Sequence, residues 1–155
     1  MKRIEIRILN VEDADDLLSL TQSDDRSYKK YFSAFDEDIS VISKILCEYD
    51  RDRYWGIWVG AELAGMFMLR GFDKGFEIPA YGVYVARKFS GCGLANTTLH
   101  YSMCWCKING ISELMLSVHK DNIVARGLYE ANGFVFSGEF SSKGHWIYRK
   151  LLIRE

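Results

Sequence analysis

Lys88-Phe89-Ser90-Gly91-Cys92-Gly93 stands between a strand-like run, Tyr81 to Val85, and a helix-like run, Leu94 to Ile108. A tight glycine turn between a strand and a helix start directs several unpaired backbone N–H groups to one point, where their partial positive charge suits a phosphate. Glycine also lets a ligand approach the backbone closely and adopts positive φ without penalty. The stretch therefore predicts a phosphate-binding loop, although a plain tight turn would explain the glycines equally well.

Two well-known phosphate-binding motifs do not fit this loop. The dinucleotide fingerprint requires a third glycine three residues after Gly93, and Asn96 stands there. The nucleoside-triphosphate loop ends in Gly-Lys-Ser or Gly-Lys-Thr, whereas Gly93 is followed by Leu94. An assignment of the loop therefore depends on a second motif.

The second motif lies downstream and reads Asn122-x-x-Ala125-x-x-x-Tyr129, followed by Gly133-Phe134. Asn122, or the residue before it, can cap a helix, and Gly133 stands where a left-handed residue commonly ends one. The four-residue spacing places Ala125 and Tyr129 on the same face of that helix. The segment is therefore predicted to be a short amphipathic helix.

Together, the loop and this helix resemble the GNAT superfamily of acyl-CoA-dependent N-acetyltransferases over about residues 77–140. In that family an Arg/Gln-x-x-Gly-x-Gly/Ala loop holds the pyrophosphate of coenzyme A, and an Asn-x-x-Ala-x-x-x-Tyr helix lies beside the pantetheine arm. Here Lys88 stands at the Arg/Gln position, and Phe89 stands where many members have glycine. A lysine still offers positive charge to a phosphate. The resemblance implies an enzyme that uses acetyl-CoA as cosubstrate and no metal.

The rest of the sequence divides into elements that suit the same fold. Apolar alternation and glycine turns predict strands at about 3–9, 53–59, 62–70, 77–85, 113–118, 134–140 and 146–152. Helical spacing predicts helices after Asn10, around 42–49, over 94–108 and from Asn122. The predicted class is α/β (α+β): one domain over 1–155, with a mostly antiparallel, twisted mixed sheet of about seven strands flanked by helices. The resemblance implies that the strands before and after the glycine-loop helix splay apart and hold the acyl chain between them.

Composition excludes several other classes of protein. The 155 residues are 48% hydrophobic and 26% charged, which is ordinary for one globular domain. A net charge of −1 argues against nucleic acid as a partner, and no apolar run is long enough to predict a membrane span. The start, Met1 to Arg7, alternates like a strand and unlike a secretion signal.

The four cysteines lack metal-binding spacing, so we expect a reduced, cytoplasmic protein. Folds of this kind often pair through their last strands, which makes a homodimer one alternative.

Acetyl transfer to an amine needs a polarised thioester carbonyl, a neutral amine and a protonated leaving thiolate. The resemblance implies that Tyr129, a phenol with an ordinary pKa of about 10, protonates the thiolate; the alternative is a ring that only packs in the core. Glu77, eleven residues before Lys88, stands where some histone-acetylating members place a general base. An exposed glutamate at a strand start is an equal alternative, and Pro79 predicts a bulge, an unpaired stretch or an edge there.

The resemblance also names the residues that would hold coenzyme A. The backbone of Val83, Tyr84 and Val85 would pair with the pantetheine amides like an added strand, and one of its N–H groups would polarise the thioester carbonyl. The pyrophosphate would rest on Lys88, Phe89, Ser90, Gly91, Cys92, Gly93 and Leu94. The pantetheine arm would also contact Asn122, Ala125 and Tyr129.

The family builds its acceptor site from the first helices, the loop between them and the last strands. For this chain that implies a wall of Tyr28, Tyr31 and Phe32, with Phe35, Trp146 and Tyr148 as further candidates. Such aromatic residues also commonly pack as core or lid. Asp36, Glu37 and Asp38 would attract a cationic amine or begin the second helix. The histidines His100, His119 and His145 have no nucleophile partner in the sequence and are interpreted as structural or surface residues.

The sequence thus predicts an N-acetyltransferase that moves acetyl directly to a primary amine in a ternary complex. Overall likeness favours a small-molecule acceptor such as an amino sugar, with a protein N-terminus, a lysine or a polyamine as alternatives. A hypothesis of another class is a non-catalytic acyl-CoA-binding regulatory module. A third is a protein-interaction domain that only shares the fold.

Overall fold

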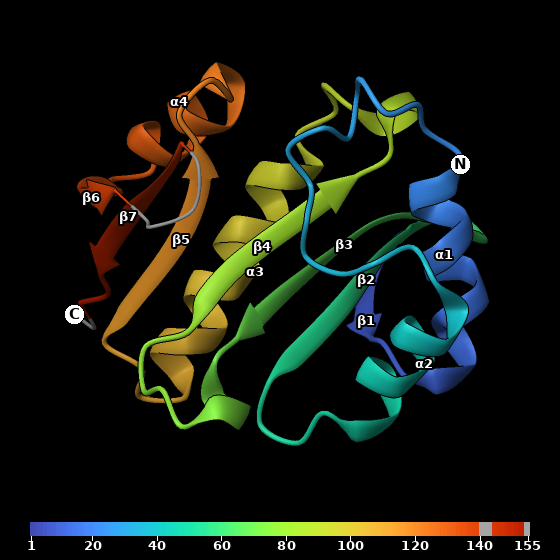
Figure 1. Cartoon of the computed structure of the whole chain (residues 1–155), viewed down its shortest axis with the longest axis horizontal. Helices are drawn as coiled ribbons and strands as arrows, with labels where there is room; N and C mark the ends of the chain where they lie inside the picture. The colour runs from blue at the N-terminus through green and yellow to red at the C-terminus, as the bar shows by residue number, and fades with distance from the viewer. Residues whose placement is uncertain (140–143, 154–155) are drawn as a thin grey trace.

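The computed structural model of the chain describes residues 1–139 and 144–153. Strands within these ranges form one seven-stranded sheet in the order β1-β2-β3-β4-β5-β7-β6 (Figure 1). The strands are β1 (Ile4–Ile8), β2 (Arg53–Val59), β3 (Glu62–Arg70), β4 (Ala80–Val85), β5 (Glu113–His119), β6 (Val135–Glu139) and β7 (His145–Leu151). The helices are α1 (Ala14–Gln22), α2 (Ile39–Glu48), α3 (Leu94–Ile108) and α4 (Ile123–Ala131). The predicted α+β class with a mostly antiparallel mixed sheet is confirmed.

The helix starts follow the capping residues of the sequence. The Asn10 side chain accepts a hydrogen bond from the Glu12 N–H at 2.9 Å, and a short 3-10 turn then leads into α1. Asp38 caps α2 through two backbone N–H groups, which confirms the helix-start alternative for this carboxylate. Asn122 caps α4 by accepting from the Ala125 N–H at 3.4 Å. Each cap fixes where its helix begins and therefore where its inner face points.

The sequence places two strand boundaries at Glu77 and Phe140. β4 begins at Ala80, opposite Arg70 of β3, and the predicted start at Glu77 is wrong. Pro79 has no N–H to donate to β3, so the ladder begins only after it. The predicted end of β6 at Phe140 lies outside the described residues, where β6 is described as far as Glu139.

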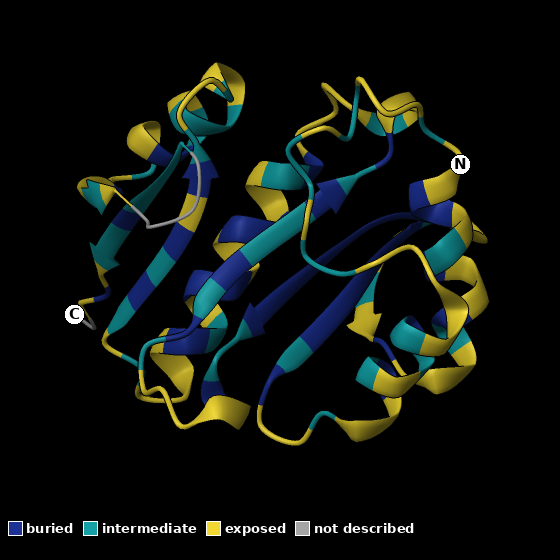
Figure 2. Ribbon diagram, in the orientation of Figure 1, coloured by how far each residue is buried: buried dark blue, intermediate teal, exposed yellow. Residues whose placement is uncertain are grey.

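The central strands β2 and β3 are buried on both faces, as the dark strands of Figure 2 show. On β3, Met66 and Met68 pack against α1 and α2, whereas Phe67 and Leu69 pack against α3 and α4. Alternation along a strand separates these two sets. Because both sets are apolar, β3 is a continuous apolar run in the sequence.

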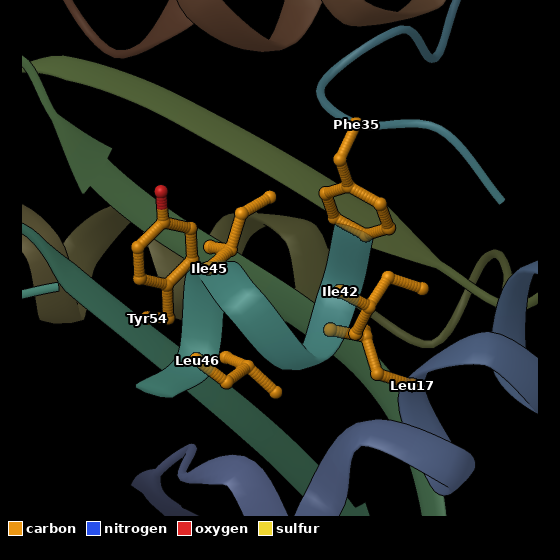
Figure 3. Close-up of a pocket in the computed structure, with 6 residues that line it drawn as sticks. All are labelled: Leu17, Phe35, Ile42, Ile45, Leu46 and Tyr54. Atoms are coloured by element: carbon orange, nitrogen blue, oxygen red, sulfur yellow. The ribbon is translucent and has the colours of Figure 1, made fainter. Parts of the chain in front are cut away.

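The α1–α2 layer closes tightly over its face of the sheet. Figure 3 shows one seam of this layer, formed by Leu17, Phe35, Ile42, Ile45, Leu46 and Tyr54. The space among these side chains is too small to admit a water molecule. The seam is therefore core, and it fixes Phe35 in packing and not in an acceptor site.

The strands β4 and β5 are parallel neighbours that pair at one place only. Among the described residues, Ala80 opposite Met115 is their one registered pair, joined by a bond from the Met115 N–H to the Pro79 carbonyl at 3.1 Å. Beyond this point the two strands diverge toward their C-terminal ends (Figure 1). The predicted splay is confirmed, and it opens at the end of β4 that leads to the glycine loop.

Truncation of the β5 core should destabilise the protein strongly. Leu116 is 0% exposed and packs between β5 and the α3–α4 layer. We expect Leu116→Ala to lower the free energy of unfolding by about 2–5 kcal/mol, through lost burial and a residual cavity. Chemical denaturation would measure this, with Val135→Ala on the exposed edge of β6 as control. Equal losses in both variants would contradict this account of the core.

Candidate active site

The glycine loop lies between β4 and α3 and is open to solvent. Gly91 and Gly93 have φ of +77° and +86°, a region that other residues rarely adopt. No described atom lies within 4 Å of the position that a Cβ would take at either residue. Gly93 is also the N-cap of α3, whose first-turn N–H groups have no partner inside the helix. The geometry fits an approaching phosphate.

Lys88 is engaged elsewhere. Its ammonium pairs with the Glu62 carboxylate at the start of β3, just after the β2–β3 turn. Beside this pair, an open groove of about 1080 Å³ separates α1 from that turn. An exposed pair of this kind contributes only about 0–1 kcal/mol. Its partner can therefore be exchanged at little cost.

β4 directs alternate backbone groups to its two sides. The N–H of Ala86, just beyond it, donates to a carbonyl of the β3 strand at 2.9 Å, whereas the carbonyl of Pro79 accepts from β5. Because bonding direction alternates along an antiparallel strand, Tyr81, Val83 and Val85 point their backbone groups to the β5 side. Among the described strands, none pairs with this side of β4 beyond the Ala80–Met115 contact. The edge is available to a ligand that can add as a strand.

Tyr84 and Val85 differ in what they can offer that ligand. The backbone of Tyr84 belongs to the β3 side, opposite Met66, so it does not face the splay. The Val85 carbonyl already accepts a bond from the Tyr28 hydroxyl at 2.6 Å. The groups of the predicted set that remain are both polar groups of Val83 and the Val85 N–H.

Tyr129 lies on the inner face of α4 and is 6% exposed. Its ring meets those of Tyr81 on β4 and Phe134 edge-on, with centroids 6.3 and 5.9 Å apart. Its hydroxyl has no hydrogen-bond partner among the described residues. Burial raises the pKa of Tyr129, which keeps the phenol protonated at neutral pH. The structure thus brings Tyr129 beside the same strand as Val83.

Glu77 is not brought to this place. It is exposed, on a bend before β4, at the end where β4 and β5 still pair. The six residues of β4 separate it from the glycine loop by about 20 Å of strand. A count of residues along the sequence gave no sign of which end of the strand opens.

The segment between α1 and α2, residues 24–35, crosses in front of β4 (Figure 1), and we call it the strap. At one end, the Asp24 carboxylate accepts bonds from the Tyr84 hydroxyl and from the Arg87 N–H, the latter at 3.1 Å. Further along, the Tyr31 ring stacks on His119 at the end of β5, with centroids 4.9 Å apart. The strap therefore contacts both sides of the splay.

The predicted acceptor aromatics do not form one wall. Tyr28 and Phe32 pack against the Tyr84 ring, with centroids 6.1 and 4.9 Å apart, and only Tyr31 reaches β5. Of the further candidates, Tyr148 is buried and donates to the Glu130 carboxylate at 2.7 Å. Trp146 lies under the Arg126 guanidinium, 4.5 Å from its ring centre, on the α4 side.

Sequence reasoning missed a polar cluster at the ends of β5 and β7. His119 and His145 are cross-strand partners with ring centroids 5.4 Å apart, and the Ser117 hydroxyl lies 3.3 Å from the His145 Nδ1. The signal was present in the alternation of β5, where Ser117 and His119 fall between apolar residues. His100, in contrast, bonds the Asn132 side chain at 2.8 Å on α3.

The described ranges contain neither a cluster of metal ligands nor a helix long and apolar enough to span a membrane. Within 1–139 and 144–153, no group of three or more His, Cys, Asp or Glu side chains is placed to hold a metal ion. Over the same residues, no helix combines the length and apolar character that crossing a membrane requires. All four cysteines carry free thiols, and Cys106 is the buried one.

Comparison with known proteins agrees with this geometry. Residues 16–134 match the model of the acetyltransferase (GNAT) family. A solved domain from Methanocaldococcus jannaschii shares the fold at 17% identity and TM-score 0.82, over 98% of this chain and 100% of that one. Ribosomal-protein-S5-alanine acetyltransferase from Vibrio fischeri does so at 13% identity and TM-score 0.80, over 98% and 97%. Spermidine N-acetyltransferase from Vibrio cholerae, in complex with CoA and spermine, does so at 21% identity and TM-score 0.75, over 96% and 95%. No curated protein sequence matches this chain.

Loss of the Asp24 carboxylate should loosen the strap. Asp24→Ala leaves the buried Tyr84 hydroxyl without its acceptor, at a cost of about 1–3 kcal/mol. Amide hydrogen exchange over residues 24–35 should then accelerate more than exchange in β3. The matched control is Asp36→Ala, which removes an exposed carboxylate that makes no side-chain hydrogen bond within the described ranges. Equal exchange in the two variants would show that Asp24 does not hold the strap.

Proposed function

The chain belongs to the GNAT acetyltransferase family, and we propose that it moves the acetyl group of acetyl-CoA to a primary amine. The observation that carries this proposal is the unpaired edge of β4, which runs from the glycine loop to the ring of Tyr129. An extended ligand with amide groups and a pyrophosphate matches that edge and that loop together. Coenzyme A has both parts.

In this proposal each part of acetyl-CoA has a place. The pyrophosphate binds the open N-terminus of α3 and the backbone of Gly91 and Gly93. The pantetheine amides pair with the Val85 N–H and the Val83 carbonyl, and the Val83 N–H, farther from the loop and nearer Tyr129, polarises the thioester carbonyl. Asn122 supports this arrangement indirectly, because it fixes the start of the helix that carries Tyr129.

The proposed reaction is direct. The neutral amine attacks the thioester carbonyl carbon, the new C–N bond forms, and the C–S bond breaks to release the thiolate. Tyr129 donates its phenolic proton to the thiolate and regains one from the acylated nitrogen. An acetylated-cysteine intermediate is disfavoured at Cys106, because burial raises the pKa of the Cys106 thiol to about 12. Transfer in a ternary complex needs no such intermediate.

Glu77 has no role in this proposal, since it lies at the closed end of the splay. The acceptor remains a small primary amine such as an amino sugar, the class favoured by the sequence. The names of two structural neighbours keep a ribosomal-protein alanine and a polyamine as alternatives. A non-catalytic module would bind coenzyme A at the same edge and release no thiol.

Coenzyme A should stabilise the folded protein through the glycine loop. At a ligand concentration about 100-fold above Kd, binding to the folded state alone adds about 2.7 kcal/mol, so the melting temperature should rise. Gly93→Ala should abolish most of that rise, because alanine is strained at φ +86°. Gly75→Ala is the control, at φ +89° and equally unobstructed, in a turn before β4. A full rise in Gly93→Ala, or no rise in the wild type, would contradict the loop assignment.

Tyr129→Phe should separate catalysis from binding. We expect thiol release to fall by about 10²–10⁴-fold, the usual contribution of a general acid, while the melting-temperature rise with coenzyme A persists. Tyr101→Phe on the exposed side of α3 is the matched control. Undiminished turnover in Tyr129→Phe would show that the ring only packs in the core.

A further inference from the structure

The acceptor approaches the splay from the strap side. On β5, Leu116 and Val118 belong to the core under α3 and α4, the layer that also holds Tyr129. Alternation turns Ser117 and His119 to the opposite face, where the strap lies. Because acetyl-CoA is proposed to occupy the α3 side of the splay, the amine must come past these outward side chains.

On this face of the sheet, the Nε2 of His119 is a hydrogen-bond donor. Its Nδ1 accepts a bond from the Asp121 N–H at 3.1 Å, so the neutral ring carries its proton on Nε2. The Tyr31 ring, stacked at 23° to the imidazole, sets the plane of that donor. The Nε2 atom faces Gly144, where an added Cβ would lie only 3.1 Å from it.

Positive charge gathers around the same point. The Cε of Lys120 lies 3.6 Å from the same Cβ position at Gly144, so the Lys120 chain and the His119 Nε2 border one glycine. Lys30 places its ammonium 4.9 Å over the Tyr31 ring. The opposing charge is that of Asp121, whose carboxylate lies 3.8 Å from the other ring nitrogen, Nδ1. The Lys120 side chain and the imidazole Nε2 of His119 thus border the same backbone position.

We infer that the acceptor is a primary amine that also carries an anionic group, a phosphate or a carboxylate, bound by His119 and Lys120. This inference rests on the proposed function, since it names the substrate class of the same reaction. Charge-assisted bonds from imidazole and ammonium groups suit such oxyanions. A polyamine would instead bring further positive charge against the Lys120 ammonium, which disfavours it. The anionic group is a spectator, and the bonds made and broken are those of amine acetylation.

The test compares amines that differ in one group. Thiol release from acetyl-CoA is measured with ethanolamine, O-phosphoethanolamine and β-alanine, with glucosamine and glucosamine 6-phosphate, and with spermidine. We expect the anionic member of a set to exceed its neutral counterpart by about tenfold or more in kcat/KM, the size of one charged hydrogen bond. A higher kcat/KM for O-phosphoethanolamine than for β-alanine would show that the site binds a phosphate better, and the reverse would show that it binds a carboxylate better.

The possible failures are distinguishable. Turnover of spermidine, or of the neutral amines, at rates equal to or above those of the anionic ones would overturn this inference and leave the proposed function intact. Absence of thiol release with every amine would overturn the proposed function, and the inference with it.

Two variants assign the preference to residues. Lys120→Gln and His119→Gln should each reduce the ratio of phosphorylated to unphosphorylated rates by about tenfold, with little change for the unphosphorylated amine. Lys44→Gln on α2 and His100→Gln on α3 are the matched controls and should keep the wild-type ratio. If a substitution lowers both rates equally and keeps their ratio, the substituted residue supports the fold and does not bind the anionic group.

Discussion

The single point at which β4 and β5 pair, Ala80 opposite Met115, determines much of what this fold can do. Buried backbone groups need partners, and a parallel neighbour would normally supply them along the whole strand. Here the neighbour moves away, and polar groups of Val83 and Val85 are left without a strand partner. The constraint is therefore a backbone one: something other than a strand must satisfy this edge. A pantetheine arm is a ligand of the required shape and bonding pattern.

The strap is the second consequence of that divergence. Tyr28 bonds the Val85 carbonyl, Tyr31 stacks on His119 of β5, and Asp24 accepts from the hydroxyl of Tyr84 on the face of β4 that the strap covers. These contacts come from a segment without regular structure, so side chains alone determine its path. A short segment held at both sides of an opening limits which acceptors can enter. Specificity can then change through strap residues while the sheet stays the same.

Interactions between sequence neighbours made the helix starts and the β2–β3 turn predictable from the sequence. Asn10, Asp38 and Asn122 cap helices because a side-chain oxygen satisfies nearby N–H groups, and this depends only on neighbours in the sequence. The Gly60–Ala61 turn joins β2 and β3 for the same kind of reason. Failures came from long-range contacts. Lys88 pairs with Glu62, and Tyr31 meets His119, only because the fold brings distant segments together. No spacing in the sequence encodes either contact.

The chemistry that distinguishes this chain lies on the acceptor side. Structures with TM-scores of 0.75–0.82 share its fold at 21% identity or less, and two of them are named for a polyamine and for a ribosomal-protein alanine. In the proposed function, a backbone edge and a glycine loop bind coenzyme A without needing particular side chains, which is compatible with so little shared sequence. The acceptor, in contrast, can be read only by side chains that face the strap. In this chain those side chains are His119 and Lys120, which border Gly144 at its left-handed backbone position of φ +80°, and Tyr31, which stacks on His119. That position leaves the space in which the imidazole and the ammonium chain meet, so a single glycine on β7's approach helps to decide which amines the splay can accept.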